Sequence, residues 1–332
     1  MDLRTMKDAA AHSLATASYD PKKLAALHTG AALGLSLILT VINFLLTRSI
    51  DGAGGLAQLG NRAVLSTVQS LLSLAGTLAL PFWEIGFLAA ALRLCRRADA
   101  QPRDLAEGFR RMGPVARLYL LQFGLYLLVA FAAMQIAGVL FSFTPFLDNT
   151  LKTMQQVLEQ SSSAGQAVLD EAALQAILPA LIPMYVIFFL VFVVVAIPLF
   201  YRFRMASFSL MDDAPGALKA MASSSRMMRG NRLRLFKLDL SLWWYYGAQL
   251  LIAGVAYADM LLPALGISLP LSADALFFIT YAVHLLLQLA LAWSCASYVQ
   301  TTYAHCYDAL KTAVPPAPTP EPAPKNLPWE QP

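Results

Sequence analysis

The sequence predicts an all-α protein, a polytopic membrane helical bundle with six transmembrane helices, two cytoplasmic amphipathic elbow helices and an external helical hairpin. Hydrophobic residues make up 58% of the 332 residues and charged residues only 13%, with a mean hydropathy of +0.58. A water-soluble domain carries about 25% charged residues, so this surface cannot face water throughout. Lysines and arginines gather in alternate connectors, which is typical of membrane topology rather than nucleic-acid binding.

Six apolar runs are long enough to cross a bilayer, for which about 20 residues suffice. We predict the spans at residues 24–46, 73–94, 118–141, 180–201, 240–261 and 275–298. A helical extension, residues 63–72, precedes the second span, and Pro81 is expected to kink it. Gly30 and Gly34 in the first span have the GxxxG spacing that lets another helix approach closely, although such pairs also occur without a packing role.

The segments outside the spans differ in composition. Residues 1–23 predict a cytoplasmic amphipathic helix that ends at Asp20-Pro21, and residues 24–311 form the membrane domain. Residues 312–332 are rich in proline and predict a disordered tail. This tail is a candidate binding segment for a protein partner, or it is a passive extension.

The two elbows are connectors rich in arginine. In the first, Leu105, Phe109 and Met112 recur at helical spacing, which predicts a helix lying on the anionic inner leaflet. The arginines act either as topology determinants alone or as binding groups for anionic lipids. They are Arg96, Arg97, Arg103, Arg110, Arg111, Arg226, Arg229, Arg232 and Arg234. By the positive-inside rule, both termini are cytoplasmic and the protein lies in the cell membrane.

The remaining connectors are poor in basic residues. The connector at residues 142–179 carries Lys152 as its single basic residue and two amphipathic patterns separated by a serine-rich turn, which predicts the external hairpin. Asp239 is a candidate N-cap for the fifth span. The aromatic run at residues 243–246 is placed as an interfacial belt.

The two elbows also resemble each other. Residues 98–105 (ADAQPRDL) align with residues 211–218 (MDDAPGAL), which pairs Asp99 with Asp212. We interpret this as a parallel internal repeat, with chance similarity between two basic connectors as the alternative.

From the second elbow onward, the chain resembles a family of bacterial integral membrane proteins known as domain of unknown function 975. The resemblance rests on Gly230-Asn231-Arg232, on Leu238-Asp239-Leu240-Ser241 and Trp244, and on a closing pattern that includes Tyr298, Thr302 and Tyr307. It implies a membrane protein without an established activity, and it transfers no catalytic residue.

One set of polar residues lies inside the predicted spans. Glu84 is placed near the centre of the second span, where a charged carboxylate costs several kcal/mol unless it is protonated, paired or hydrated. Gln249 and His284 fall at similar depths, and Gln288 lies one turn from His284. We predict a polar cluster of these four residues at the membrane midplane. The alternative is that Glu84 is neutral and bonded to a neighbouring helix.

Catalytic motifs are absent from the sequence, which favours a function other than catalysis. Four scattered histidines and three cysteines without CxxC spacing predict no metal site, and no cofactor is expected. We therefore predict a permease-like transporter or a transport-accessory subunit with a midplane polar site. The alternative is an envelope scaffold or regulatory membrane protein that binds partners or anionic lipid. The sequence does not predict an oligomeric state.

Overall fold

The computed structural model describes residues 3–51, 57–163, 171–213, 216–267 and 270–313, and every regular element within them is helical. In chain order the elements are α1 (Leu3–Ala15), α2 (Pro21–Asp51), α3 (Ala57–Cys95), η1 (Pro102–Ala106), α4 (Glu107–Arg110), α5 (Met112–Ser142), α6 (Phe146–Ser163), α7 (Glu171–Phe203), α8 (Ala206–Asp212), α9 (Ala217–Met227), α10 (Arg232–Ser241), α11 (Trp243–Ala256), α12 (Ala258–Ala264), α13 (Ala273–Leu291), η2 (Ala292–Ala296) and α14 (Ser297–Ala313).

Five stretches of helix in the described residues are long and apolar enough to cross a membrane. They are Pro21–Arg48, Val64–Cys95, Met112–Ser142, Pro179–Asp212 and Ala273–Ala313. Each overlaps one of the six predicted spans. The predicted span at residues 240–261 is divided among α10, α11 and α12, the longest of which has 14 residues. Five candidate membrane helices are therefore present, and the sixth crossing stays a prediction.

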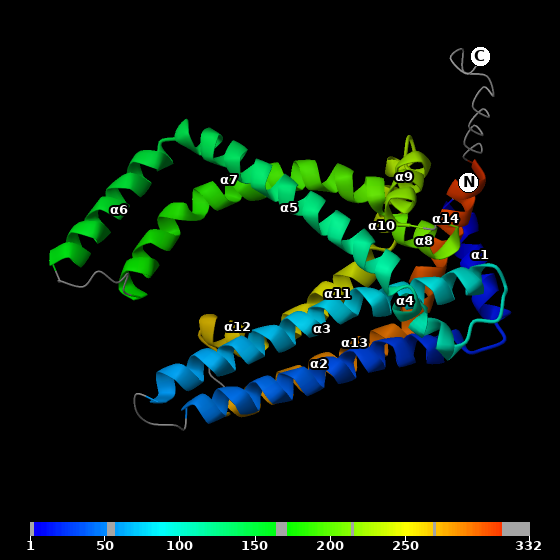
Figure 1. Ribbon diagram of the computed structural model, residues 1–332, viewed down its shortest axis with the longest axis horizontal. Coiled ribbons are helices and arrows are strands. Elements are labelled where there is room, and N and C mark those ends of the chain that lie inside the picture. The colour runs from blue at the N-terminus through cyan, green and yellow to red at the C-terminus, as the bar shows by residue number, and fades with distance from the viewer. Residues whose placement is uncertain (1–2, 52–56, 164–170, 214–215, 268–269, 314–332) are drawn as a thin grey trace, which may run out of the picture.

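The long helices form two arms that diverge from one end of the molecule (Figure 1). In the first arm α5 packs along α7, and α6 folds back on α7. In the second arm α2 packs against α3 and α11 packs against α13. Both arms expose large apolar side chains, such as Leu128 of α5 and Val194 of α7 in the first arm and Leu251 of α11 in the second. A membrane protein presents such side chains to lipid.

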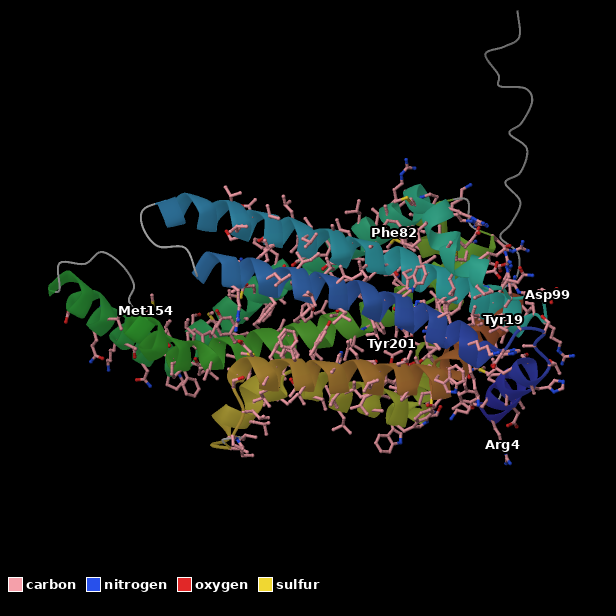
Figure 2. The ribbon with its side chains drawn as sticks, turned by 90° about the horizontal axis from the view of Figure 1, so that it is seen from below. Arg4, Tyr19, Phe82, Asp99, Met154 and Tyr201 are labelled. Atoms are coloured by element: carbon pink, nitrogen blue, oxygen red, sulfur yellow. The ribbon has the colours of Figure 1, made fainter. Side chains whose placement is uncertain are left out.

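The arms meet in a compact region that we call the junction, made of α1, η1, α4, α8, α9, α10, α14 and the ends of the long helices nearest to them. Ile85 of α3, Leu118 of α5, Met205, Leu235 of α10 and Tyr307 of α14 are all buried there in one core. Figure 2 shows Tyr19 and Asp99 at this end and Met154 on α6 toward the other. The largest buried side chains of the described residues thus lie in the junction.

The amphipathic pattern at the start of the chain is used for packing within the protein. Met6, Ala10 and Ser13 lie on one face of α1 and are buried against α14 and α3. Ser13 Oγ is 3.0 Å from His305 Nε2 of α14. The helix that the sequence placed on the membrane surface is therefore part of the junction core.

The first elbow is a short 3₁₀ segment and one α-helical turn, η1 and α4, pressed against α3. A methyl group at Gly86 would lie 1.9 Å from the Leu105 carbonyl oxygen, and one at Gly108 would lie 1.8 Å from the Phe82 carbonyl oxygen. Only glycine allows these two backbones to approach so closely. Leu105 is therefore buried against α3, whereas Phe109 remains exposed. The sequence predicts one surface helix through Leu105, Phe109 and Met112, but the structure divides these residues among η1, α4 and α5.

The second elbow contains α9, which lies between α8 and α10. Ala217, Ala220, Ser224 and Met227 recur at helical spacing and are buried, so one face of α9 packs on the junction. Gly230 then adopts a positive φ of 80° in the turn before α10. Positive φ is a conformation that glycine adopts at little cost.

The predicted hairpin at residues 142–179 is present as two packed helices. The second of its predicted helices is the beginning of α7, which continues through Pro179 and Pro183 without interruption. Thr150 Oγ1 of α6 donates to the Ala180 carbonyl oxygen at 2.9 Å and joins the two helices. The proline-rich tail, residues 314–332, lies outside the described residues.

Candidate functional site

Two of the predicted site residues bond to each other across the α11–α13 contact. Gln288 Nε2 donates to Gln249 Oε1 at 3.0 Å, and Gln249 Nε2 donates to the Tyr245 hydroxyl at 3.3 Å. Tyr245 and Gln249 are one helical turn apart, so both side chains lie on the same face of α11. Tyr245, which the sequence placed in an aromatic belt, thereby extends the polar row by one turn.

The third predicted residue, His284, lies one turn along α13 from Gln288. Its Nδ1 donates to the Ile252 carbonyl oxygen at 2.9 Å, because a carbonyl can only accept. If the ring is neutral, Nε2 is left as an acceptor, and no partner for it is present among the described residues. Soon after Ile252 the chain leaves α11 at Tyr257 and re-enters helix as α12. His284 therefore contacts α11 one turn before a break in that helix.

A second row of polar groups runs along the antiparallel contact between α2 and α13. The Tyr281 hydroxyl lies 2.9 Å from Ser36 Oγ and 3.1 Å from Thr40 Oγ1. Its ring stacks on the His284 ring with centroids 6.3 Å apart. Tyr281 and His284 are separated by three residues, which is the spacing of side chains on one helix face. Ser36, Thr40 and Tyr281 were not among the predicted site residues, although the three-residue spacing of Tyr281 from His284 is a signal that could have indicated Tyr281.

The fourth predicted residue, Glu84, lies apart from the other three. It is exposed on α3, and no hydrogen bond or ion pair of its carboxylate is present among the described residues. Its neighbour Ile85 is buried in the junction core, against which Tyr119 of α5 and Tyr245 of α11 pack. Glu84 is thus located beside the core where the two arms meet, and no hydrogen bond joins it to Tyr245 or Gln249. A direct contact between Glu84 and His284 is not observed.

The glycine pair of the first span makes no close contact. A methyl group at Gly30 would lie 4.0 Å from Leu289 Cδ1 of α13, an ordinary van der Waals distance, and one at Gly34 would have no heavy atom within 4 Å. The packing role predicted for Gly30 and Gly34 therefore stays a prediction. The close backbone approaches of this fold are at Gly86 and Gly108 instead.

The elbow arginines are all exposed, and they divide by their partners. Arg96 donates to both carboxylate oxygens of Asp212, at 2.6 and 2.9 Å, and to Asp308 at 2.6 Å. The hydrogen bonds that Arg96 donates to Asp212, followed by those to Asp308, raise the pKa of its guanidinium above the ordinary value. Arg110 and Arg111 pair with Glu107.

The other elbow arginines make no ion pair with a described residue. Arg234 is hydrogen-bonded to Asn231 Oδ1 at 3.4 Å. The remaining five are Arg97, Arg103, Arg226, Arg229 and Arg232.

Asp239 is the acceptor of a second polar cluster in the junction. Tyr201 of α7 donates its hydroxyl to Asp239 at 2.6 Å, and Tyr303 of α14 also donates to Asp239. Tyr246 is 2.5 Å from the Tyr303 hydroxyl, and the Arg204 guanidinium lies 5.0 Å from the Tyr303 ring centre. Asp239 lies inside α10, so its predicted role as an N-cap is wrong. It joins the end of the first arm to the second arm.

Comparison with known proteins places the whole membrane domain in one family. A family model described as "Protein of unknown function (DUF975)" matches residues 21–314. The chain belongs to the DUF975 family. No curated protein and no solved structure matches it. The residues that carried the resemblance in the sequence, among them Asp239 and Tyr307, are in the junction of this DUF975 protein.

Metal-binding groups do not gather in the part of the DUF975 chain that the structure describes. No three histidine, cysteine, aspartate or glutamate side chains there lie close enough to hold a metal ion. Cys95, Cys295 and Cys306 are free thiols. The candidate site consists of the two polar rows on the membrane helices. One row contains Tyr245, Gln249 and Gln288, and the other contains His284 and Tyr281.

The Gln249–Gln288 bond predicts a specific pattern of stability in this DUF975 protein. Gln249→Leu and Gln288→Leu should each destabilise the fold by about 1 kcal/mol, because each leaves a half-buried amide without its partner. The double substitution should cost less than the two single costs combined, because it leaves neither amide unpaired. Heat unfolding of the four proteins in detergent checks this, and costs that simply add would show that the bond contributes nothing.

Proposed function

We propose that this DUF975 member is a permease-like membrane protein, a transporter or a transport-accessory subunit, that binds a proton or a small polar solute at Gln249, His284 and Gln288. The observation that supports it is the set of bonded polar side chains on α11 and α13, two otherwise apolar helices. Polar groups in membrane helices are costly and mark substrate pathways. Interrupted helices are a recurring feature of transporter sites, and α11 is interrupted one turn beyond Ile252.

The proposal includes six crossings. The helices α11 and α12 together cover residues 243–264, about 33 Å at about 1.5 Å per residue, which is enough to cross the hydrocarbon core. The break at Tyr257 would then lie within the crossing. Six crossings give both termini the same side, and the arginines of the elbows favour the cytoplasmic side of the cell membrane.

In this proposal Glu84 is the inner end of the polar row. Its exposed carboxylate lies beside the core where the arms meet, and Tyr245, which packs against that core, is hydrogen-bonded through Gln249 to Gln288. A hydroxyl and two amides in a row can bind a small polar solute by hydrogen bonds, and a carboxylate near them favours a proton or a cationic group. His284, with its second ring nitrogen unpartnered, is the group that accepts a proton at the outer end of the row.

Proton uptake into proteoliposomes tests this function. The purified protein is reconstituted with a pH-sensitive dye inside, and a potassium gradient with valinomycin sets an inside-negative potential. The wild-type protein should acidify the interior faster than empty liposomes do. His284→Phe should lower the rate to that of empty liposomes, because phenylalanine keeps the ring but removes both nitrogens. Gln155→Leu on the exposed surface of α6 is the matched control and should retain the wild-type rate.

Two outcomes would contradict the proposal. One is a wild-type rate no faster than that of empty liposomes, with a known proton carrier active in the same preparation. The other is a His284→Phe rate equal to the wild-type rate, since the site would then be dispensable.

A second candidate function is an envelope scaffold or regulator that binds anionic lipid. It is favoured by the exposed arginines without an ion pair among the described residues, of which Arg226, Arg229 and Arg232 lie around the α9–α10 turn. Each basic residue near an anionic surface contributes about 1 kcal/mol. Phosphatidylglycerol should then raise the unfolding temperature of the wild type in detergent but not that of the triple substitution to glutamine. An equal rise in both proteins would contradict this candidate.

A further inference from the structure

A groove with an apolar floor lies between α1, α10 and α14. Its volume is about 260 Å³, and its floor includes Met6 of α1, Leu235 and Leu238 of α10 and Leu310 of α14. A hollow lined mainly by apolar side chains, with a few polar groups at its edge, is the usual form of a binding site. The groove is open at the end of α14, because Ala313, the last described residue of the chain, also lines it.

One edge of the groove is basic. Arg234 and Lys237 of α10 line it, and neither makes an ion pair with a described residue. An occupant that combines apolar side chains with a carboxylate would match both the floor and this edge.

The chain that continues from Ala313 contains such a segment. Residues 314–326 hold prolines, small or polar residues and a single Val314, and Leu327-Pro328-Trp329-Glu330 follows. Trp329 is the only aromatic residue after Ala313, and Glu330 comes directly after it.

We propose that the groove is the docking site of residues 327–330 of the same chain, with Leu327 and Trp329 on the apolar floor and Glu330 paired with Arg234 or Lys237. The 13 residues between Ala313 and Leu327 reach about 40 Å when extended, at about 3.1 Å per residue, so they are long enough to leave the groove and return. Because the tail starts at the groove, its effective concentration there is of order millimolar, which favours its own segment over that of a second copy.

The reactivity of Cys306 reports occupancy of the groove, because this thiol lines the groove. In a protein with Cys95→Ala and Cys295→Ala, we compare the rates at which a maleimide labels Cys306. Trp329→Ala should raise the rate about fivefold or more, which is the change expected if the segment occupies the groove four-fifths of the time. Thr319→Ala changes the tail outside the segment and is the matched control, which should label at the wild-type rate.

Equal labelling of the Trp329→Ala variant and the full-length protein would overturn the proposal. Mixing separates docking within one chain from docking between copies. A Trp329→Ala protein that keeps Cys306 is reconstituted with an excess of protein that carries Cys306→Ser and an intact tail. Labelling that stays fast supports docking within the chain. Labelling that slows shows that a second copy supplies the segment, which overturns the same-chain docking.

Discussion

Replacing Gly108 by alanine is expected to destabilise the fold by about 3 kcal/mol or more, which is the upper part of the range for overpacked sites. The added methyl group would lie 1.8 Å from the Phe82 carbonyl oxygen. This oxygen belongs to helix backbone and cannot rotate away as a flexible side chain would. To relieve the contact, α4 would have to separate from α3. The midpoint of heat unfolding in detergent should fall sharply, together with the yield of folded protein.

Gly113→Ala is the matched control, because it adds the same methyl group a few residues further along. A methyl group at Gly113 would have no heavy atom within 4 Å. Since alanine favours helix over glycine by about 1 kcal/mol, this substitution should be neutral or stabilising. Equal stability of Gly108→Ala and Gly113→Ala would show that the first elbow is not packed on α3 as described.

Replacing Asp212 by alanine should destabilise the junction by about 2 kcal/mol, within the range for hydrogen bonds to charged groups, because its partners Arg96 and Lys311 are themselves exposed. Its side chain is only 8% exposed and accepts from Arg96, from Lys311 at 2.7 Å and from Tyr307 at 3.1 Å. Those groups belong to the end of α3 and to α14, so Asp212 joins the end of the first arm to the second. Arg96 and Lys311 would each retain one other carboxylate, which keeps the cost from being larger.

Its neighbour Asp213 provides the comparison. Asp213 also pairs with Lys311, but its side chain is 62% exposed, and exposed pairs contribute about 1 kcal/mol or less. Asp213→Ala should therefore change the unfolding midpoint little. If Asp212→Ala and Asp213→Ala had the same small effect, the network around Arg96 would not be what holds the arms together.

The apolar runs were sufficient to predict five of the long helices, because length and hydropathy determine which segments avoid water. The break between α11 and α12 was not predictable in the same way. The residue at the break is Tyr257, and the sequence there holds no proline. The first elbow shows a second limit. Its amphipathic pattern is the same whether the apolar face contacts lipid or packs on α3. The close packing on α3 depends on Gly86 and Gly108, and a glycine in a sequence does not by itself indicate which backbone will approach it.

For the candidate site, helical spacing predicted which residues share one face of a helix, but it did not predict the relative depth of residues on different helices. Gln249 and His284 were placed at similar depths with Gln288 one turn from His284, and Gln249 and Gln288 are hydrogen-bonded. Glu84 was placed at a similar depth on the assumption that the membrane crossing of its helix begins at residue 73. Helix α3 covers 39 residues, about 58 Å, nearly twice what a bilayer requires, so the depth of Glu84 does not follow from its sequence position.

The most direct test of the account is crosslinking of cysteine pairs in native membranes, in a protein whose three native cysteines are replaced by alanine. A short bifunctional thiol reagent should join the pair Gln249→Cys with Gln288→Cys, because the native side chains touch across α11 and α13. It should not join Glu84→Cys with His284→Cys, for which no contact is observed. Efficient crosslinking of the second pair without the first would contradict both the site and the proposed function that rests on it.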